Sequence, residues 1–239
     1  MAQSKEQCIW LHTPKENQQF IHKEYQKHQK IYNNILEAIG KTPMVRLQKI
    51  PQSLGLKCEV LVKCECLSVG GSVKDRIGQR MVEDAEKMGV IKPGYTLIEA
   101  TSGNAGIGLA LSAAVKGYKM IITMPEKMSQ EKINVLKGLG AEVVRTPTHL
   151  GSFEEGSHIM TARKLQSELE NAIILDQYNN PSNPLAHYDQ TGEEIWDQCD
   201  GKLDYIFAGT GTGGTITGIS SRLKEHDSKI KAVGIDPYG

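Results

Sequence analysis

The chain has 239 residues, of which 39% are hydrophobic and 23% are charged, an ordinary composition for a globular protein with a sizeable core. Its 28 Lys and Arg residues balance its 28 Asp and Glu residues, so net charge gives no argument for binding nucleic acid or an anionic membrane surface. No apolar run approaches the ~20 residues that span a bilayer, and the beginning, MAQSKEQCIW, lacks the apolar region of a secretory signal. We therefore expect a cytoplasmic protein, and we do not expect its five cysteines to form a disulfide scaffold.

Residues 1–30 are rich in Gln, Lys and His and are predicted to form a polar arm. The segment IYNNILEAI then predicts a short helix that Gly40 and Pro43 end. After it, short β-rich apolar runs alternate with helical stretches. The runs are MVRL, EVLVKC, TLIEA, MIITM, EVVRT, AIILD, YIFAG and KAVGID. This alternation predicts an α/β fold with a mostly parallel sheet covered by helices on both faces.

The first chemical motif is GGSVKDR, residues 70–76, at the start of a predicted helix. Ser72 is the expected N-cap, Asp75 completes a capping-box pattern, and Gly89 ends the helix. Lys74 then lies in the first turn, where the positive end of the helix helps to depress the pKa of an amine. This chemistry permits Lys74 to form a Schiff base, and a solvated surface lysine is the ordinary alternative.

The second motif is TSGNAG, residues 101–106, which directly follows the run TLIEA. Ser102 or Asn104 is expected to cap the helix that comes next, and free N–H groups at a helix start bind anions. The pattern fits a loop that grips a substrate carboxylate, and it also fits an ordinary turn between a strand and a helix.

The third motif is GTGTGGT, residues 209–215, which places many N–H and hydroxyl donors at a helix N-terminus. Such a group of donors suits a phosphate. The same run also matches the G-x-G-x-x-G of dinucleotide-binding folds through Gly209, Gly211 and Gly214, with Asp236 after the next strand. A nicotinamide-dependent oxidoreductase therefore stays open, although it leaves the first two motifs unexplained.

The three motifs together resemble fold-type II pyridoxal-phosphate (PLP) enzymes, the cysteine synthase and cystathionine β-synthase group, from about residue 35 to 239. Other matching segments are IGKTPMVRL, MPEKMSQEK, LGAEVVRTPT, ILDQYNNPSNPLAHY and DPYG. Within the group, LKCEVLVKCEC, IKPG and NPLAHYD are more similar to cystathionine β-synthases than to cysteine synthases. The resemblance implies a tryptophan-synthase-β-like fold of two open, mostly parallel α/β subdomains. The catalytic core would span 31–239, with a smaller subdomain over roughly 80–185 inserted in the larger one.

The resemblance also implies a role for each matching residue. Lys74 matches the lysine that holds the cofactor, Asn104 the asparagine that bonds its ring hydroxyl, and Tyr178 a tyrosine on the substrate side; Lys74 and Tyr178 are the expected catalytic residues. The loop expected to cradle the phosphate comprises Gly211, Thr212, Gly213, Gly214 and Thr215. The loop expected to bind the substrate comprises Thr101, Ser102, Gly103, Asn104 and Ala105. Ala105 replaces the usual threonine, so we expect substrate binding to be weaker by ~1 kcal/mol or more.

The implied reaction replaces a group on the β-carbon of an amino acid. Serine loses hydroxide, a homocysteine thiolate adds to give cystathionine, and Lys74 removes and returns the Cα proton. Cysteine in place of serine would release sulfide. A cysteine synthase, which uses acetylated serine and sulfide, and an inactive truncated paralogue both stay open. A homodimer is the expected assembly.

Two further expectations concern the ends of the chain. Resemblance to animal cystathionine β-synthases implies haem bound by Cys8 and His22 in the arm, in addition to PLP. Two arginines that support haem in that family are Asn179 and Ser221 here, so an arm without haem stays open. The catalytic core of the family continues beyond the position of Gly239, so we expect a C-terminally incomplete chain.

Overall fold

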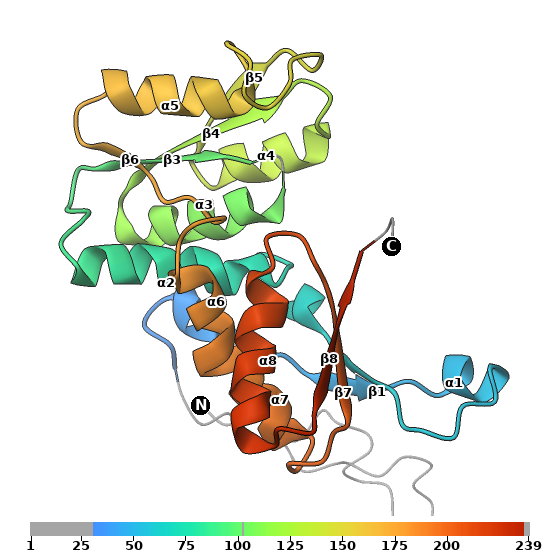
Figure 1. Cartoon of the computed structure of the whole chain (residues 1–239). Helices are drawn as coiled ribbons and strands as arrows, with labels where there is room; N and C mark the ends of the chain where they lie inside the picture. The colour runs from blue at the N-terminus through green and yellow to red at the C-terminus, as the bar shows by residue number, and fades with distance from the viewer. Residues whose placement is uncertain (1–30, 102, 237–239) are drawn as a thin grey trace, which may run out of the picture. The chain divides into compact units, whose positions relative to one another are not determined.

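The computed structural model describes residues 31–101 and 103–236, and all eight runs predicted as strands form strands in it (Figure 1). Their bounds are β1 (Met44–Arg46), β2 (Leu61–Lys63), β3 (Thr96–Ala100), β4 (Lys119–Pro125), β5 (Glu142–Thr146), β6 (Ala172–Ile174), β7 (Tyr205–Gly209) and β8 (Lys231–Ile235). The prediction of an α/β fold is therefore confirmed.

Helices separate most of these strands. Their bounds are α1 (Lys49–Ser53), α2 (Lys74–Lys87), α3 (Asn104–Lys116), α4 (Gln130–Gly138), α5 (His158–Glu168), α6 (Ser182–Ala186), α7 (Gly192–Gln198) and α8 (Gly214–His226). The shorter turns are the 3-10 helices η3 (Ile35–Ala38) and η4 (Glu65–Leu67) and the π-helix η5 (His187–Thr191). None of the helices in the described ranges is long and apolar enough to cross a membrane.

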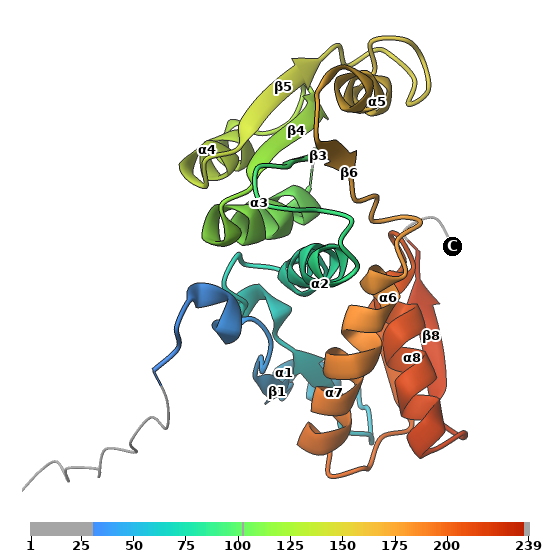
Figure 2. The same ribbon diagram turned by 90° about the vertical axis from the view of Figure 1, so that its left-hand side faces the viewer.

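Four parallel strands form the largest sheet, in the order β5-β4-β3-β6 (Figure 2). Successive side chains of a strand face opposite sides of a sheet, and the core divides accordingly. Leu97 packs with residues of α2, α3 and α4 on one face, whereas its neighbour Ile98 packs with Ala162 of α5 on the other. Helices therefore cover both faces of this sheet, as the alternating pattern predicts.

The strand order of this sheet creates a position suited to ligand binding. β3 comes first along the chain; the chain then runs outward to β4 and β5 and crosses back to place β6 on the other side of β3. In open α/β sheets, ligands bind beyond the carboxyl ends of the strands at such a switch point. The segment that follows β3 begins at Thr101, and the segment that follows β6 begins at Leu175. These two segments therefore emerge side by side.

Glycines allow α2 and α3 to approach each other closely. A Cβ added at Gly78 would collide with the backbone of Gly108, and one added at Gly108 would collide with the carbonyl oxygen of Lys74. The first turn of α2 thus lies against α3, one turn after its start at Asn104. This crossing brings the beginnings of the two helices together.

A second parallel unit, β7-α8-β8, follows along the chain. Ile195, Ile219, Leu223 and Ile230 form its core, which includes α7. A Cβ at Gly218 would collide with the carbonyl oxygen of Pro184, so α8 also packs tightly against α6. Strands β1 and β2 form a separate antiparallel pair. The boundaries of the smaller subdomain, roughly 80–185, remain a prediction, because residues 32–239 cluster as one unit.

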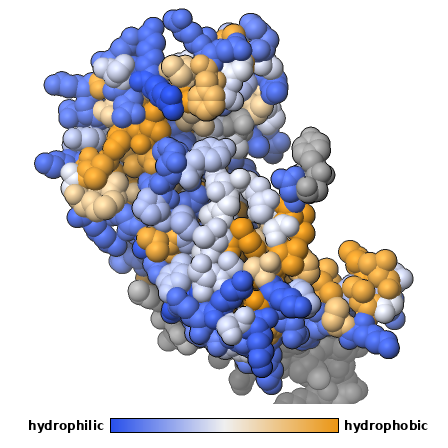
Figure 3. All heavy atoms as spheres, viewed as in Figure 1, coloured by the Kyte–Doolittle hydropathy of each residue, from blue (hydrophilic) through white to orange (hydrophobic). Residues whose placement is uncertain are grey.

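Apolar side chains are exposed in several places on the face shown in Figure 3. Ile50, Leu54 and Leu56 are exposed on and just after α1, and Phe207 and Ile235 are exposed along β7 and β8. Apolar patches of this kind commonly mark surfaces that another molecule or segment covers.

The predicted cap of α2 is wrong by one residue. The N-cap is Val73, not Ser72, and it makes no side-chain cap bond. The Ser72 hydroxyl instead accepts from the Lys74 N–H at 3.2 Å. The Asp75 carboxylate reaches back past the serine to accept from the Gly70 N–H at 2.6 Å. Asp75 therefore ties down the preceding Gly-Gly turn, and the helix begins one residue later than expected.

Candidate functional site

The amine of Lys74 begins α2 and lies in partly desolvated surroundings. The residue is half-buried, and burial lowers the pKa of the amine below its usual value of 10.5. A lysine in the first turn of a helix also lies at the positive end of the helix dipole, which disfavours its charged form. The neutral, nucleophilic form of Lys74 is therefore favoured relative to a surface lysine.

The segment after β3 is anchored before it turns into α3. The Thr101 N–H donates to the Thr123 carbonyl of β4 at 3.1 Å, and the Thr101 hydroxyl accepts from the Gly103 N–H at 3.2 Å. Helix α3 has Gly103 as its N-cap, so the prediction that Ser102 or Asn104 caps the helix is wrong. Asn104 is instead the first helical residue, with an exposed side chain, while Ala105 is buried. The Asn104 amide is thus free of the capping role and lies near the start of α2.

The glycine-threonine run forms the turn between β7 and α8. Gly213 has a left-handed backbone (φ 80°) and is the N-cap of α8. A Cβ on Gly214 would collide with the side chain of Asn183, so only glycine fits there. N–H groups in the first turn of a helix have no intrahelical acceptor. Together with the hydroxyls of Thr212 and Thr215, they form a set of donors suited to a phosphate.

A buried histidine lies directly behind this loop. The Nε2 atom of His187 is 3.1 Å from the Thr215 hydroxyl oxygen, and its Nδ1 atom is 3.0 Å from that of Thr191. Burial, followed by the positive charges of Arg76 and Lys74, lowers the pKa of His187 to about 4. The ring is therefore neutral near pH 7, and Lys74 lies close enough for its charge to act on it.

The segment after β6 lines a cavity of about 160 Å³ at the start of α8. The lining residues are Tyr178, Asn179, Asn180, Pro181, Asn183, Pro184, Thr212, Gly213, Gly214 and Thr217. The Asn183 amide donates to the Thr212 hydroxyl at 2.9 Å and to the Gln177 carbonyl at 2.7 Å. The exposed ring of Tyr178 and the glycine-threonine loop therefore share one concave surface.

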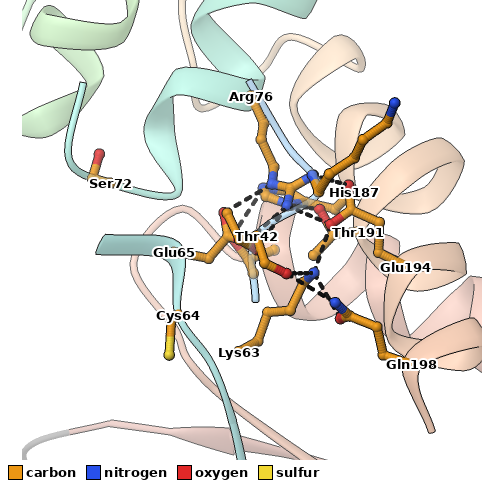
Figure 4. Close-up of polar contacts among 12 residues, drawn as sticks. Thr42, Lys63, Cys64, Glu65, Ser72, Arg76, His187, Thr191, Glu194 and Gln198 are labelled. Carbon is orange, nitrogen blue, oxygen red and sulfur yellow. Dashed lines mark hydrogen bonds and ion pairs between the residues drawn. The ribbon is translucent and has the colours of Figure 1, made fainter. Parts of the chain in front are cut away.

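A buried ion-pair network joins α2 to β2, η4 and α7 (Figure 4). The Arg76 guanidinium is fully buried and pairs with Glu65 at 2.8 Å and with Glu194 at 2.7 Å. Lys63 also pairs with Glu194, at 2.6 Å. Burial would raise the pKa of Glu194, but hydrogen bonds from Arg76 and Lys63 outweigh it and hold the value at about 2. The network fastens the segment before α2 and helix α7 to the first turn that carries Lys74.

The structure brings the predicted site residues together in two groups. The α2–α3 crossing joins Lys74 to the segment with Thr101, Gly103, Asn104 and Ala105. The second group consists of Tyr178 and the loop of residues 211–215, which share a cavity. Lys74 and Asn104 do not line this cavity. The link between the groups is His187, which bonds Thr215 and is affected by the charge of Lys74.

Three predicted residues, Ser102, Cys8 and His22, lie outside the described residues. Within the described ranges, no group of three or more His, Cys, Asp or Glu side chains is arranged to hold a metal ion. Asn179 and Ser221, at the positions of the two haem-supporting arginines, are neutral and make no ion pair. The Asn179 amide donates to the Asp176 carboxylate at 2.7 Å.

Sequence reasoning missed several residues that organise the site. His187, Asn183 and Gln177 occur in ILDQYNNPSNPLAHY, a segment that the sequence identifies only by its resemblance to the family. Glu99 belongs to the strand run TLIEA, and its carboxyl group is buried beside the segment after β6. A charged residue inside an otherwise apolar strand run was the one available signal.

These residues suit the PLP that the resemblance implies. Lys74 offers a partly desolvated amine, and Asn104 offers an exposed amide next to it. The cradle at the start of α8 admits no side chain at Gly214, which leaves the N–H groups of the first turn accessible to a phosphate. An amine, an amide and a phosphate-binding helix start are the donor groups that an aldehyde bearing a ring hydroxyl and a phosphate requires.

Comparisons with known proteins agree with this chemistry. A family model described as pyridoxal-phosphate dependent enzyme matches residues 35–239. A cystathionine beta-synthase of Apis mellifera is 60% identical over 210 residues, covering 88% of this chain and 42% of that protein. One of Rattus norvegicus is 57% identical over 233 residues, covering 97% and 42%. The chain thus spans less than half the length of these curated relatives.

A solved structure is also similar over most of the chain. The crystal structure of a hydrogen sulfide-producing enzyme from Fusobacterium nucleatum matches with a TM-score of 0.81 and 38% sequence identity. The match covers 87% of this chain and 67% of that one. The predicted fold and the arrangement of the elements therefore have an experimentally determined counterpart.

Proposed function

The chain belongs to the family of pyridoxal-phosphate dependent enzymes, and on that premise we propose that it serves a β-replacement reaction that condenses L-serine with L-homocysteine to cystathionine. Relatives that are 57–60% identical to the chain are named for this product, which supports the choice of substrates. The observation that carries the proposal is the half-buried amine of Lys74, close to the neutral His187 that bonds the glycine-threonine loop.

Three groups of the chain would hold the cofactor. The Lys74 amine would hold its aldehyde, and the Asn104 amide would hydrogen-bond its ring hydroxyl. The N–H groups and hydroxyls of residues 211–215 would bind its phosphate at the positive end of α8. When bound, PLP supplies an electron sink that stabilises negative charge at the Cα of the attached amino acid.

Lys74 also moves the proton. With the substrate in place, the Nζ atom of Lys74 would act as the base, because its lowered pKa favours the neutral form that can accept the Cα proton. The same atom later returns the proton, because the group that removed it stays in place. Both halves of the replacement therefore use a single amine at the start of α2.

The segment after β3 orients the substrate. Its N–H groups, with the side chains of Thr101, Ser102 and Asn104, bind the substrate carboxylate, which lies near the positive end of α3. Ala105 offers no hydroxyl at this position, so the carboxylate receives one donor fewer than with a threonine. Tyr178 lies on the substrate side of the cofactor, at the mouth of the cavity of residues 178–184 and 212–217.

Other donors and acceptors remain alternatives for the same site. Cysteine in place of serine would release sulfide, and the similarity to a hydrogen sulfide-producing enzyme favours this as a second activity. A cysteine synthase would instead use acetylated serine and sulfide. We set the nicotinamide oxidoreductase aside, because the family match includes the glycine-threonine run on which that alternative rested.

Three finer proposals concern the surroundings of the protein. We propose a cytoplasmic location and a homodimer in which a second copy buries exposed apolar side chains such as Ile50 and Phe207. Haem bound by Cys8 and His22 stays a proposal about residues that the structure does not describe. A visible spectrum that shows a Soret band, lost on Cys8→Ser, would support haem.

The central experiment expresses the chain with added PLP and measures its visible spectrum and its products. We expect a band from lysine-bound cofactor that disappears in Lys74→Ala and persists in Lys87→Ala, whose side chain is exposed at the other end of α2. Serine plus homocysteine should yield cystathionine faster than acetylserine plus sulfide yields cysteine. A folded chain that binds no PLP would favour the inactive paralogue instead.

A further inference from the structure

A buried carboxyl group lies at the switch point between β3 and β6. Glu99 is 3% exposed and is the penultimate residue of β3. Its Oε2 atom accepts from the Asp176 N–H at 3.2 Å and its Oε1 atom from the Gln177 N–H at 3.4 Å. One side chain of β3 thus holds the backbone that follows β6.

The turn of Asp176 and Gln177 has a backbone conformation that suits a carboxylate. Asp176 has a left-handed backbone (φ 55°), which few residues other than glycine adopt without cost. Successive N–H groups around such a residue converge into an anion-binding concavity. The Asp176 carboxylate also accepts from the Tyr178 N–H at 3.0 Å and from the Asn179 amide at 2.7 Å. The turn therefore presents two N–H groups to Glu99 and fixes the backbone of Tyr178.

Hydrogen bonds continue from this turn to the phosphate loop. The Gln177 carbonyl accepts from the Asn183 amide at 2.7 Å, and the same amide donates to the Thr212 hydroxyl at 2.9 Å. The Thr212 hydroxyl in turn accepts from the Gly214 N–H at 3.4 Å. An unbroken series of bonds thus joins β3 to the first turn of α8.

Burying a carboxyl group costs free energy that an apolar side chain would avoid. The cost shows in the pKa of Glu99, which burial raises to about 7 despite the two N–H donors. An apolar residue would pack between the helices at this end of β3 but could not accept from residues 176 and 177. The acid at this position is therefore explained by the two bonds and not by packing.

We propose that Glu99 is a positioning residue for substrate binding. Its carboxylate joins the segment that starts at Thr101 to the turn that carries Tyr178, so the two sides of the substrate site keep a fixed spacing. This inference rests on the proposed function, because it assigns the substrate to the space between these two segments. It makes Glu99 important for the amino-acid substrate and less important for the cofactor, which Lys74 holds covalently.

The test compares Glu99→Gln with the wild-type chain, both loaded with PLP. Glutamine keeps the shape but replaces one acceptor oxygen with a donor, so one of the two N–H groups loses its partner. We expect the affinity for L-serine, followed by the visible spectrum, to fall about fivefold to tenfold, as one lost hydrogen bond implies. The affinity for PLP should change less than about twofold. Amide exchange should accelerate at residues 176 and 177 and stay unchanged at Ile122 of β4.

Two further variants sharpen the comparison. Glu142→Gln alters an exposed carboxylate at the start of β5 and should leave both affinities unchanged. Asp176→Ala disturbs the same turn from its other side, while Glu99 stays in place. Asp176→Ala should reproduce the selective loss of serine affinity. If Glu99→Gln does not fold, this variant tests the positioning role in its place.

The outcomes separate this inference from the function on which it rests. Equal loss of serine and PLP affinity would indicate a general structural role and overturn the proposal. Unchanged exchange at 176 and 177 would overturn it as well. If the wild-type chain binds PLP but not serine, the proposed function fails and the positioning role fails with it. The exchange data then still show whether Glu99 holds the turn.

Discussion

The Nε2 atom of His187 lies 3.1 Å from the hydroxyl oxygen of Thr215, the last residue of the glycine-threonine loop that is proposed to bind phosphate. A neutral imidazole has one donor nitrogen and one acceptor nitrogen. When Nε2 carries the proton and donates to Thr215, the hydroxyl proton of Thr215 is free to point at a bound phosphate. The Thr191 hydroxyl, 3.0 Å from Nδ1, then supplies the matching donor on the other side of the ring.

This relationship predicts that His187→Phe weakens PLP binding by about tenfold. The variant loses the hydrogen bond from Nε2 to Thr215, worth about 1 kcal/mol, and the Thr215 hydroxyl is no longer oriented toward the phosphate. His187→Gln keeps an N–H donor and should recover part of the affinity. Titration of the chain with PLP, followed by fluorescence, measures both. His149→Gln, at an exposed position, is the control. Equal affinities for the Phe variant and the wild type would contradict the role of His187.

Two buried groups should give the stability of the fold opposing pH dependences. The pKa of His187 falls from 6.5 to about 4 through burial and nearby positive charges, so its contribution to stability is lost as pH falls through that range. Burial raises the pKa of Glu99 from 4.5 to about 7, so its contribution is lost as pH rises through that range. Each shift corresponds to roughly 3 kcal/mol, and the two nearly cancel between about pH 4.5 and 6.5.

Replacing either Glu99 or His187 should therefore expose the pH dependence that the other group gives to the stability. The free energy of unfolding of Glu99→Gln should rise with pH more steeply than that of the wild type over this window, and that of His187→Gln should fall. Urea unfolding at a series of pH values measures these slopes. Parallel curves for the wild type and both variants would show that neither group titrates as the structure implies.

The α2–α3 crossing should tolerate no side chain. Gly108→Ala places a methyl group against the carbonyl oxygen of Lys74, so the helices must separate and the start of α2 must move away from Asn104. Overpacking of this kind costs about 1–3 kcal/mol. We expect a lower melting temperature and weaker PLP binding together. Gly138→Ala, at the end of α4 with open space around it, should change neither.

The ion-pair network should be costly to break from its cationic side. Arg76→Met leaves the Glu65 carboxylate without its ion-pair partner and Glu194 with Lys63 alone, and breaking such a buried pair costs about 3–5 kcal/mol. Arg76→Lys keeps a charge but loses the forked geometry, so its effect should be intermediate. Thermal unfolding measures both, with Arg163→Met on the exposed side of α5 as the control. A melting temperature that Arg76→Met leaves unchanged would contradict this role.

The strands and the family motifs could be predicted because their signals are local. Runs such as TLIEA and YIFAG combine β-rich composition with flanking turns, and each forms a strand. Gly89 follows the C-cap of α2 in the left-handed conformation, as predicted. The start of α2 differs from the prediction by one residue. The Asp75 carboxylate accepts from the Gly70 N–H, a bond outside the expected capping pattern, and the helix starts at Lys74.

The organisation behind the site could not be predicted because it depends on contacts between distant segments. His187 and Thr215 are 28 positions apart, and Glu99 and Gln177 are 78 positions apart. Nothing local to a histidine or glutamate specifies such partners. The family resemblance supplies the residues that are proposed to bind the ligands, whereas the contacts that position them are seen only in the fold.

The strand order β5-β4-β3-β6 also has a consequence for the order of folding. β3, β4 and β5 are neighbours both along the chain and in the sheet, so their pairing closes short loops. Pairing of β6 with β3 must close a long loop that contains β4, β5 and their helices. We therefore expect this long-range pairing to be the slow step. The candidate site includes the segment that follows β6. Ligand affinity should therefore be acquired late in folding, after most of the sheet has already formed.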